Sequence, residues 1–246
     1  MNYLSLFSGA GGGDLAFQHL LGFKCVGYVE YENYCQRLIR QRIEDGLLDA
    51  APIFGDIRRF NSEGYAESYQ GLVDVVSGGF PCQDISCAGK GAGLEGERSG
   101  LWFEMEAIIR TIRPRYVFIE NSTRLLVLGF DRIVCGLSEM GYNASWGIVS
   151  ASDVGAPHLR KRLWALFSID ISYTTSIRQQ KSCFNLHQFK KSEIYGKTWN
   201  GKRVDQPGIV GVVDGVAYQM DRLKAAGNGQ VPIVAATAFR ILSGLK

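Results

Sequence analysis

Short apolar runs alternate with helix-like segments through most of the chain, and this alternation restricts the fold more than any other feature. Apolar runs of this length are typical of buried parallel strands. We expect strands at 3–7, 24–29, 52–54, 72–77, 115–119, 142–149 and 163–167, and helices at 14–21, 33–45, 101–112, 123–140 and 233–242. The alternation predicts an α/β fold, in which helices cover both faces of a mostly parallel, seven-stranded sheet.

Composition narrows the class of protein. The chain has 246 residues, which is enough for one large core and a small second lobe. Its six cysteines include no CxxC pair, so we expect neither a zinc site nor a disulfide framework, and no other metal. No signal peptide precedes residue 3 and no apolar run approaches ~20 residues, so we expect a soluble cytoplasmic protein without a membrane partner.

Residues 78–83 (GGFPCQ) place a cysteine shortly after the apolar run 72–77. Open α/β sheets carry their chemistry at the carboxyl ends of parallel strands, where Cys82 is expected to lie. Pro81 stiffens the backbone before the thiol, and the glycines after it allow a loop to move. Cys82 is therefore either a nucleophile beneath a mobile loop or a structural cysteine, since free cysteines are often buried.

A glycine turn, residues 8–13 (SGAGGG), joins the first expected strand to the first expected helix. Backbone N–H groups in such a turn can receive a polar ligand, and Gly9 and Gly11 allow its close approach. Glu30 at the end of the second strand suits ribose hydroxyls, and Tyr31 beside it suits a purine ring. Although the dinucleotide fingerprint GxGxxG is incomplete, turn and acid together favour an adenosine-containing ligand over a solvated loop glutamate.

Polar residues stand at the ends of three more expected strands. Asp56 can accept a hydrogen bond from an adenine amino group, or it can lie in an exposed turn. Glu120 ends the strand that follows the Cys82 segment, so a thiol and a carboxyl can meet at one edge of the sheet, although such acids also cap helices. Arg160 and Arg162 share one side of an extended segment, where they can bind an anion or a base oxygen or form a solvated basic edge.

A basic segment lies between residues 176 and 203, with seven Lys or Arg residues and one acid, Glu193. Aromatic residues at 184, 189, 195 and 199 are interspersed with them. Basic and aromatic side chains together suit a nucleic-acid surface, through phosphate contacts and base stacking. A solvated insertion without fixed structure has the same composition, so both interpretations stay open at this point.

Five segments, in this order along the chain, resemble the motifs of the DNA (cytosine-5) methyltransferase family. They are residues 6–12 (LFSGAGG), 78–83 (GGFPCQ), 120–122 (ENS), 157–162 (PHLRKR) and 227–231 (GNGQV). Ser122 stands where the family usually has Val, and His158 stands where it usually has Gln. The resemblance implies the Rossmann-like fold of S-adenosylmethionine-dependent methyltransferases, with a small target-recognition lobe.

The resemblance also implies a reaction. A methyl group passes from S-adenosylmethionine to C5 of a cytosine flipped out of double-stranded DNA, and S-adenosylhomocysteine is the product. Cys82 would add to C6 of the base and so activate C5. Glu120 would bind N3 and the exocyclic amine, and Arg162 would face O2 with support from Arg160.

Further site residues follow from the same resemblance. The implied cofactor contacts are Phe7, Gly9, Gly11, Glu30, Tyr31, Asp56, Ile57, Leu101 and Asn228. The implied DNA contacts are Gln83, Ser86, Lys90 and Arg98 near the nucleophile, and Lys190, Lys191, Lys202 and Arg203 in the basic segment.

Three regions are expected along the chain. They are a catalytic, S-adenosylmethionine-binding domain at 1–168, a small target-recognition region at 169–224, and a C-terminal helix at 225–246 that returns to the catalytic domain. The recognition region is shorter than is usual in the family, which suggests relaxed specificity or a contribution from a second protomer. A cognate restriction enzyme is another expected partner, and the nucleoid of a bacterial or phage-infected cell is the expected location.

Three other functions compete with this one. The first is an inactive DNA-binding or partner-activating subunit of the same fold, which the intact Cys82, Glu120 and Arg162 disfavour. The second is a tRNA cytosine-5 methyltransferase, whose Cys-Phe-Thr signature has its nearest counterpart at residues 183–185 (CFN). The third, a nicotinamide oxidoreductase, has no use for a Pro-Cys pair beside a glutamate.

Overall fold

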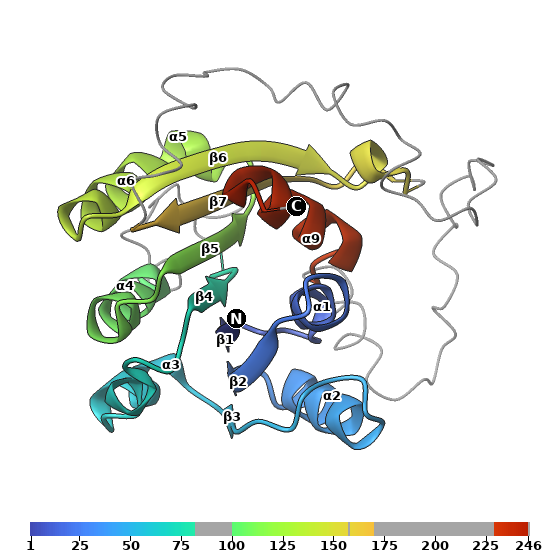
Figure 1. Ribbon diagram of the computed structural model, residues 1–246, viewed down its shortest axis with the longest axis vertical. Helices are drawn as coiled ribbons and strands as arrows, with labels where there is room; N and C mark the ends of the chain where they lie inside the picture. The colour runs from blue at the N-terminus through green and yellow to red at the C-terminus, as the bar shows by residue number, and fades with distance from the viewer. Residues whose placement is uncertain (82–99, 157, 170–228, 246) are drawn as a thin grey trace.

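The computed structural model describes residues 1–81, 100–156, 158–169 and 229–245, and a seven-stranded sheet forms its centre (Figure 1). The strands are β1 (Asn2–Leu6), β2 (Lys24–Val29), β3 (Ile53–Phe54), β4 (Val75–Gly78), β5 (Tyr116–Asn121), β6 (Asn143–Ser150) and β7 (Lys161–Ser168). Their order across the sheet is β3-β2-β1-β4-β5-β7-β6. Strands β1 to β5 are parallel, whereas β7 is antiparallel to both β5 and β6. The predicted mostly parallel sheet is confirmed.

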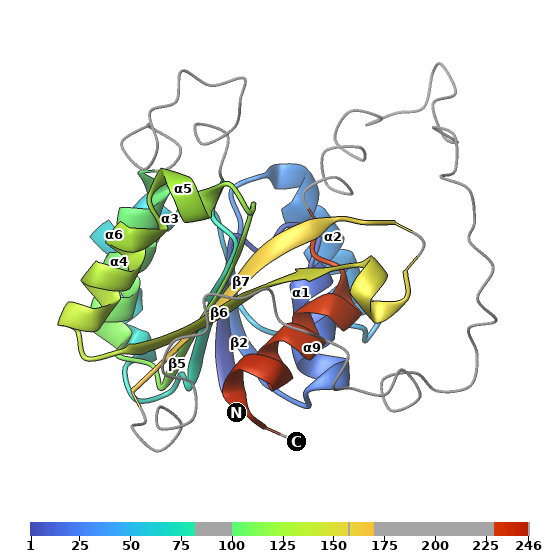
Figure 2. The same ribbon diagram turned by 90° about the horizontal axis from the view of Figure 1, so that it is seen from above.

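Helices cover both faces of the sheet, as predicted (Figure 2). One face carries α3 (Ile57–Ser62), α4 (Leu101–Ile112), α5 (Leu125–Leu128) and α6 (Phe130–Glu139). The other face carries α1 (Gly12–Leu15), which continues as the π-helix η1 (Ala16–Leu20), together with α2 (Asn33–Glu44) and α9 (Pro232–Ser243). Two short 3₁₀ helices are η2 (Ala66–Tyr69) and η5 (Ser152–Val154). Within the described ranges, no helix is both long and apolar enough to span a bilayer.

Aromatic side chains occupy the core on both faces of the sheet. Trp102 of α4 packs on Phe80, with ring centroids 5.7 Å apart. On the opposite face, Phe239 of α9 lies 5.6 Å from Phe17 of η1 and 5.2 Å from Phe118 of β5. Helix α9 therefore packs beside the glycine turn and its helix, although more than 200 residues of chain separate them.

Two expected helices differ from those observed. The helix expected over 123–140 is divided into α5 and α6 at Gly129, whose φ of 140° is not helical. The helix expected over 14–21 starts at Gly12 and turns into the π-helix η1, where the N–H of Leu21 donates to the carbonyl of Ala16 at 3.0 Å. Glycine inside one segment and a wider turn inside the other account for these corrections.

One strand boundary and one further helix also differ from the expectations. Strand β4 starts at Val75 and not at residue 72, because Leu72 is 56% exposed and the Asp74 carboxylate accepts from the backbone N–H of Asn2 at 2.7 Å. Helix α3 was not expected. Asp56 caps it by accepting from the N–H of Arg58 at 2.9 Å. Apart from residue 169, the expected recognition region 169–224 lies outside the described residues, so the division into domains stays a prediction.

Candidate active site

The carboxyl ends of β1, β4 and β5 meet at one edge of the sheet. Leu6 of β1 pairs with Gly78 of β4, and Gly78 pairs with Ile119 of β5. The glycine turn, the segment that leads to Cys82, and Glu120 therefore start from neighbouring positions. The predicted adjacency of the strands that precede Cys82 and Glu120 is confirmed, while Cys82 itself lies outside the described residues.

Glu120 is a buried carboxyl group paired with an arginine. It is 8% exposed, and its Oε1 lies 2.9 Å from Nε of Arg162. Arg162 reaches it because β7 runs antiparallel beside β5. Burial raises the pKa of Glu120 above the ordinary glutamate value, although the positive charges of Arg162 and Arg160 partly oppose this rise. The carboxyl group therefore retains a proton more readily than an exposed glutamate does.

Arg160 connects this pair to the residues that precede α9. Its guanidinium donates to the carbonyl of Gly229 at 2.7 Å. Burial, followed by the nearby charge of Arg162, lowers the pKa of Arg160. Both arginines act electrostatically on Glu120, in agreement with their expected position on one side of an extended segment.

The glycine turn bends through backbone conformations that most residues avoid. The value of φ is 54° at Phe7, 56° at Gly9 and 77° at Gly11, so only Phe7 adopts this conformation with a side chain. The N–H of Gly9 donates to Glu30 Oε2 at 2.6 Å, and the N–H of Glu32 donates to Oε1 at 2.8 Å. Glu30 thus holds the turn against the end of β2, and a carboxylate oxygen can accept more than one hydrogen bond.

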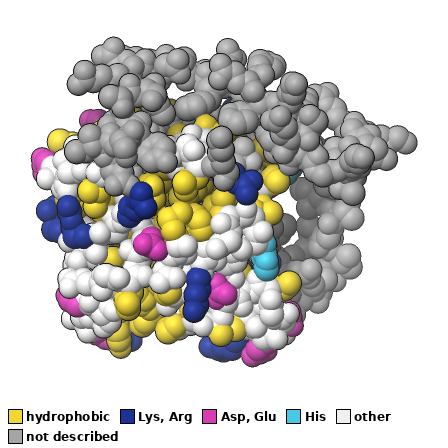
Figure 3. Space-filling model, in the orientation of Figure 1, with side chains coloured by type: hydrophobic (Ala, Val, Ile, Leu, Met, Phe, Trp, Pro, Cys, Tyr) yellow, Lys and Arg dark blue, Asp and Glu magenta, His cyan; other side chains and the backbone are white. Residues whose placement is uncertain are grey.

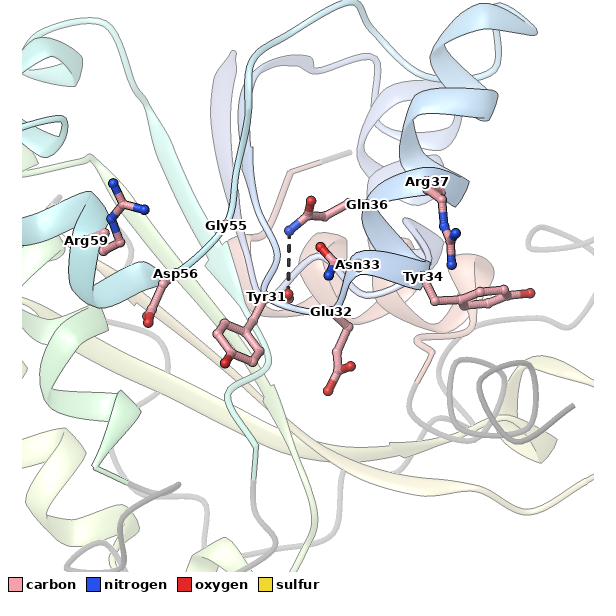
Figure 4. Close-up of a pocket in the computed structure, with 9 residues that line it drawn as sticks. All are labelled: Tyr31, Glu32, Asn33, Tyr34, Gln36, Arg37, Gly55, Asp56 and Arg59. Atoms are coloured by element: carbon pink, nitrogen blue, oxygen red, sulfur yellow. Dashed lines mark hydrogen bonds between the residues drawn. The ribbon is translucent and has the colours of Figure 1, made fainter. Parts of the chain in front are cut away.

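The Glu30 carboxylate accepts hydrogen bonds from one residue in each of two hollows. A cleft of about 530 Å³ is lined by Tyr31, Glu32, Asn33, Tyr34, Gln36, Arg37, Gly55, Asp56 and Arg59 (Figure 4). A smaller cavity of about 40 Å³ is lined by the glycine turn, the end of β4, Glu120 and residues 229–230. Because Glu30 binds Glu32 of the cleft and Gly9 of the cavity, a ligand that follows this carboxylate would contact both.

The larger cleft has the side chains of a nucleoside site. Tyr31 and Asp56 follow β2 and β3, which are neighbouring strands (Figure 4). The Tyr31 side chain is 70% exposed, so its ring presents a face to an aromatic ligand. Two other expected contacts face the core: Ile57 is 4% exposed, and Leu101 packs against the same buried cluster.

Two residues that sequence reasoning did not single out support the glycine turn. Gln230 packs so closely on Gly12 and Gly13 that a Cβ at either glycine would collide with it. Arg42 of α2 donates a hydrogen bond to the carbonyl of Ala10. Gln230 lies within the motif at 227–231, but its contact with the turn, like that of Arg42, comes from a distant part of the sequence and cannot be read from it.

Residues 1–209 match the family model described as C-5 cytosine-specific DNA methylase. The chain belongs to this family. The match confirms the family resemblance and includes four of the five motifs, while the motif at 227–231 lies beyond the matched residues. It identifies the sheet as that of an S-adenosylmethionine-dependent methyltransferase.

Curated relatives are type II methyltransferases. M.CviJI of Paramecium bursaria Chlorella virus IL3A is 32% identical over 142 residues, which are 57% of this chain and 36% of the relative. M.DsaV of Dactylococcopsis salina is 31% identical over 170 residues, with coverage of 67% and 44%. M.NlaIV of Neisseria lactamica is 27% identical over 240 residues, with coverage of 82% and 54%. This C-5 cytosine-specific DNA methylase chain thus spans about a third to a half of their length.

Solved structures support the fold of this family member. The S. pombe Dnmt2 methyltransferase superposes with a TM-score of 0.59 at 19% identity, covering 82% of this chain and 58% of that one. A putative DNA modification methyltransferase encoded within an E. coli prophage gives a TM-score of 0.53 at 22% identity, with coverage of 68% and 46%. At these identities, the likeness concerns the fold alone.

Several residues expected to act in catalysis, cofactor binding or DNA binding lie outside the described residues. They are Cys82, Gln83, Ser86, Lys90, Arg98, Lys190, Lys191, Lys202, Arg203 and Asn228. On the face shown in Figure 3, acidic and basic side chains of the described residues are interspersed. The expected nucleophile and DNA contacts therefore stay predictions.

Proposed function

We propose that this protein is a DNA (cytosine-5) methyltransferase, which transfers a methyl group from S-adenosylmethionine to C5 of a cytosine in duplex DNA. The ion pair of Glu120 and Arg162 carries this proposal. It stands at the carboxyl end of β5, beside the strand that leads to Cys82. A buried acid that retains its proton and a guanidinium held next to it are suited to stabilise charge on a cytosine ring.

Each proposed catalytic residue has one role in the methylation of cytosine. Cytosine C5 is a poor nucleophile, and addition of the Cys82 thiolate to C6 makes it electron-rich. The added charge spreads to N3 and O2 of the ring, where Glu120 provides a proton at N3 and Arg162 a positive charge near O2. Once C5 carries the new methyl group, its proton leaves to water and the Cys82 thiolate departs, which restores the ring.

The two hollows fit S-adenosylmethionine, which supplies an electrophilic methyl group when bound. The cleft offers Tyr31 and Asp56 to the nucleoside, and Glu30 stands between the cleft and the cavity. The cavity retains a buried acceptor, Gln230 Oε1, that has no hydrogen-bond partner among the described residues. Such an atom fits a ligand that carries a donor.

On the DNA side, we propose that the target cytosine leaves the double helix to reach Glu120 and Cys82. The basic segment within 169–224 would contact DNA, together with Ser86, Lys90 and Arg98 near the nucleophile. A second protomer or a cognate restriction enzyme is a proposed partner, since this recognition region is short for the family.

Covalent trapping on DNA that contains 5-fluorocytosine tests the proposal. Fluorine replaces the C5 proton and cannot leave as a cation, so the elimination that releases Cys82 is blocked and a working enzyme with S-adenosylmethionine stays bonded to its target. We expect a denaturant-resistant adduct with the unaltered protein and with Cys135→Ser, whose free thiol is exposed on α6. Cys82→Ser is expected to form none.

Other outcomes contradict the proposal in distinct ways. An adduct with 5-fluorocytosine RNA and none with DNA would assign the substrate to RNA. If the unaltered protein binds S-adenosylhomocysteine and DNA yet forms no adduct, the chain is a non-catalytic subunit. An adduct that survives Cys82→Ser would refute the assigned nucleophile.

A further inference from the structure

Gln230 lies where the glycine turn, the end of β4 and Glu120 come together. Its backbone oxygen packs so closely on Gly12 that a Cβ there would collide with it, and its side-chain oxygen lies against Gly13. The segment is held from the other side by Arg160, which donates to the carbonyl of Gly229 at 2.7 Å. The position of the Gln230 side chain is therefore closely constrained.

The amide nitrogen of Gln230 shares a small space with the Glu120 carboxyl. A Cβ built on Gly79 would lie 2.9 Å from Glu120 Oε2 and 3.4 Å from Gln230 Nε2. The Gln230 amide acts as a donor toward the Glu120 carboxyl in its effect on the pKa of that group, and both residues line the small cavity. Arg162 of β7 binds Oε1 of the same carboxyl. The two oxygens of Glu120 therefore have different neighbours, Arg162 at Oε1 and the Gln230 amide near Oε2.

The other end of the amide has an unusual environment. Gln230 Oε1 is buried, and no group in the described part of the chain donates to it. A buried acceptor without a donor is destabilising, so such an atom calls for a specific explanation. The cavity that Gln230 lines opens beside the glycine turn, where a ligand can supply the missing donor.

We propose that Gln230 is a positioning residue, whose amide nitrogen orients the Glu120 carboxyl and whose amide oxygen accepts a hydrogen bond from the ligand in the cavity. This inference rests on the proposed function, because the methionine end of S-adenosylmethionine carries one strong donor, its α-ammonium group. One side chain would then connect the bound cofactor to the acid that activates the base.

The Glu120 half can be measured without catalysis. The ionisable groups that act on Glu120 are Arg162 and Arg160, and Asp14 lines the same cavity. The hydrogen bond from Gln230 favours the ionised carboxyl and lowers its pKa, so removing the bond raises the pKa further. Gln230→Met keeps the volume and removes both polar ends.

We would follow the Glu120 carboxyl by NMR of protein labelled with ¹³C at glutamate side chains, assigning its signal with Glu120→Gln. Gln230→Met is expected to raise the Glu120 titration midpoint by about half a unit to one unit, the effect of one lost hydrogen bond. The matched control is Gln41→Ala, which removes an exposed glutamine bonded to Asp45 at 3.0 Å. An unchanged midpoint in Gln230→Met overturns the positioning role, whether or not the protein methylates DNA.

The ligand half is tested by binding of S-adenosylhomocysteine and of its analogue without the α-amino group. The unaltered protein is expected to bind the complete ligand about fivefold to tenfold more tightly than Gln230→Met does. The two proteins should bind the analogue equally. Equal binding of the complete ligand would overturn the acceptor role, whereas a protein that binds neither compound would refute the proposed cofactor.

Discussion

Replacing Arg162 with methionine should destabilise the protein in a way that depends on pH. Arg162→Met leaves Glu120 buried without its nearest positive charge, while keeping an extended side chain in place. Breaking a buried ion pair typically costs 3–5 kcal/mol, and the Arg162 side chain is 28% exposed against 10% for Glu120. We therefore expect the lower end of that range, a loss of about 3 kcal/mol at a pH where Glu120 is ionised.

The sign of the pH dependence follows from the pKa of Glu120. Burial already raises it above the ordinary value of 4.5, and removing Arg162 raises it further. The folded variant then binds more protons than the unfolded chain, so its stability falls as pH rises above 4.5. The loss relative to the unaltered protein should be small at about pH 5 and larger at about pH 8.

Urea unfolding at these two pH values measures the effect. The control is Arg59→Met, which breaks an exposed pair with Glu63 at 2.6 Å and should leave the unfolding midpoint unchanged. Glu120→Gln in the Arg162→Met background should recover most of the stability lost at high pH. A loss of equal size at both pH values would refute the electrostatic explanation.

Two further substitutions test the support beneath the cofactor site. Gly12→Ala should cost about 1–3 kcal/mol and weaken S-adenosylhomocysteine binding, because the added Cβ meets the backbone carbonyl of Gln230, which cannot move as a side chain does. Gly136→Ala, whose Cβ would meet only the Glu106 side chain, should change neither, and similar results for the two alanine variants would contradict the collision. Asp14 is 2% exposed, accepts from the Tyr3 hydroxyl at 2.9 Å, and has a pKa raised by burial to about 6. The free energy of unfolding should therefore fall as pH rises from about 4 to about 6, and Asp14→Asn should remove most of this pH dependence in urea unfolding.

Local sequence patterns were sufficient to predict the bounds of elements whose apolar residues follow a regular spacing. Strand β2 and helix α4 were expected at their observed bounds, because a short apolar run in one and helical spacing of apolar residues in the other predict these elements directly. The break at Gly129 and the π-helix η1 were missed, since both depend on how a helix fits its neighbours. Apolar content alone also extended β4 to Leu72, which the fold leaves exposed.

The candidate site could be predicted as a set of strand ends but not as a set of contacts. Glu120 and Arg162 were each singled out, yet their 2.9 Å pairing requires β7 to lie antiparallel beside β5. Gln230 was missed for a related reason. The motif at 227–231 includes it, but its contacts with Gly12 and Gly13, more than 200 residues earlier, cannot be read from the sequence.

The packing of α9 on η1 also has a consequence for how the molecule forms on the ribosome. Phe239 and Phe17 are in contact, so the layer beneath the glycine turn cannot be completed until residue 239 has emerged. Contacts between such distant residues form late, because a long chain segment must be ordered before they are gained. A nascent chain with all of β1 to β7 synthesised would still lack Gln230 and α9, so it would remain without a finished cofactor cavity. Ligand binding in this cavity would therefore await synthesis of nearly the whole described chain.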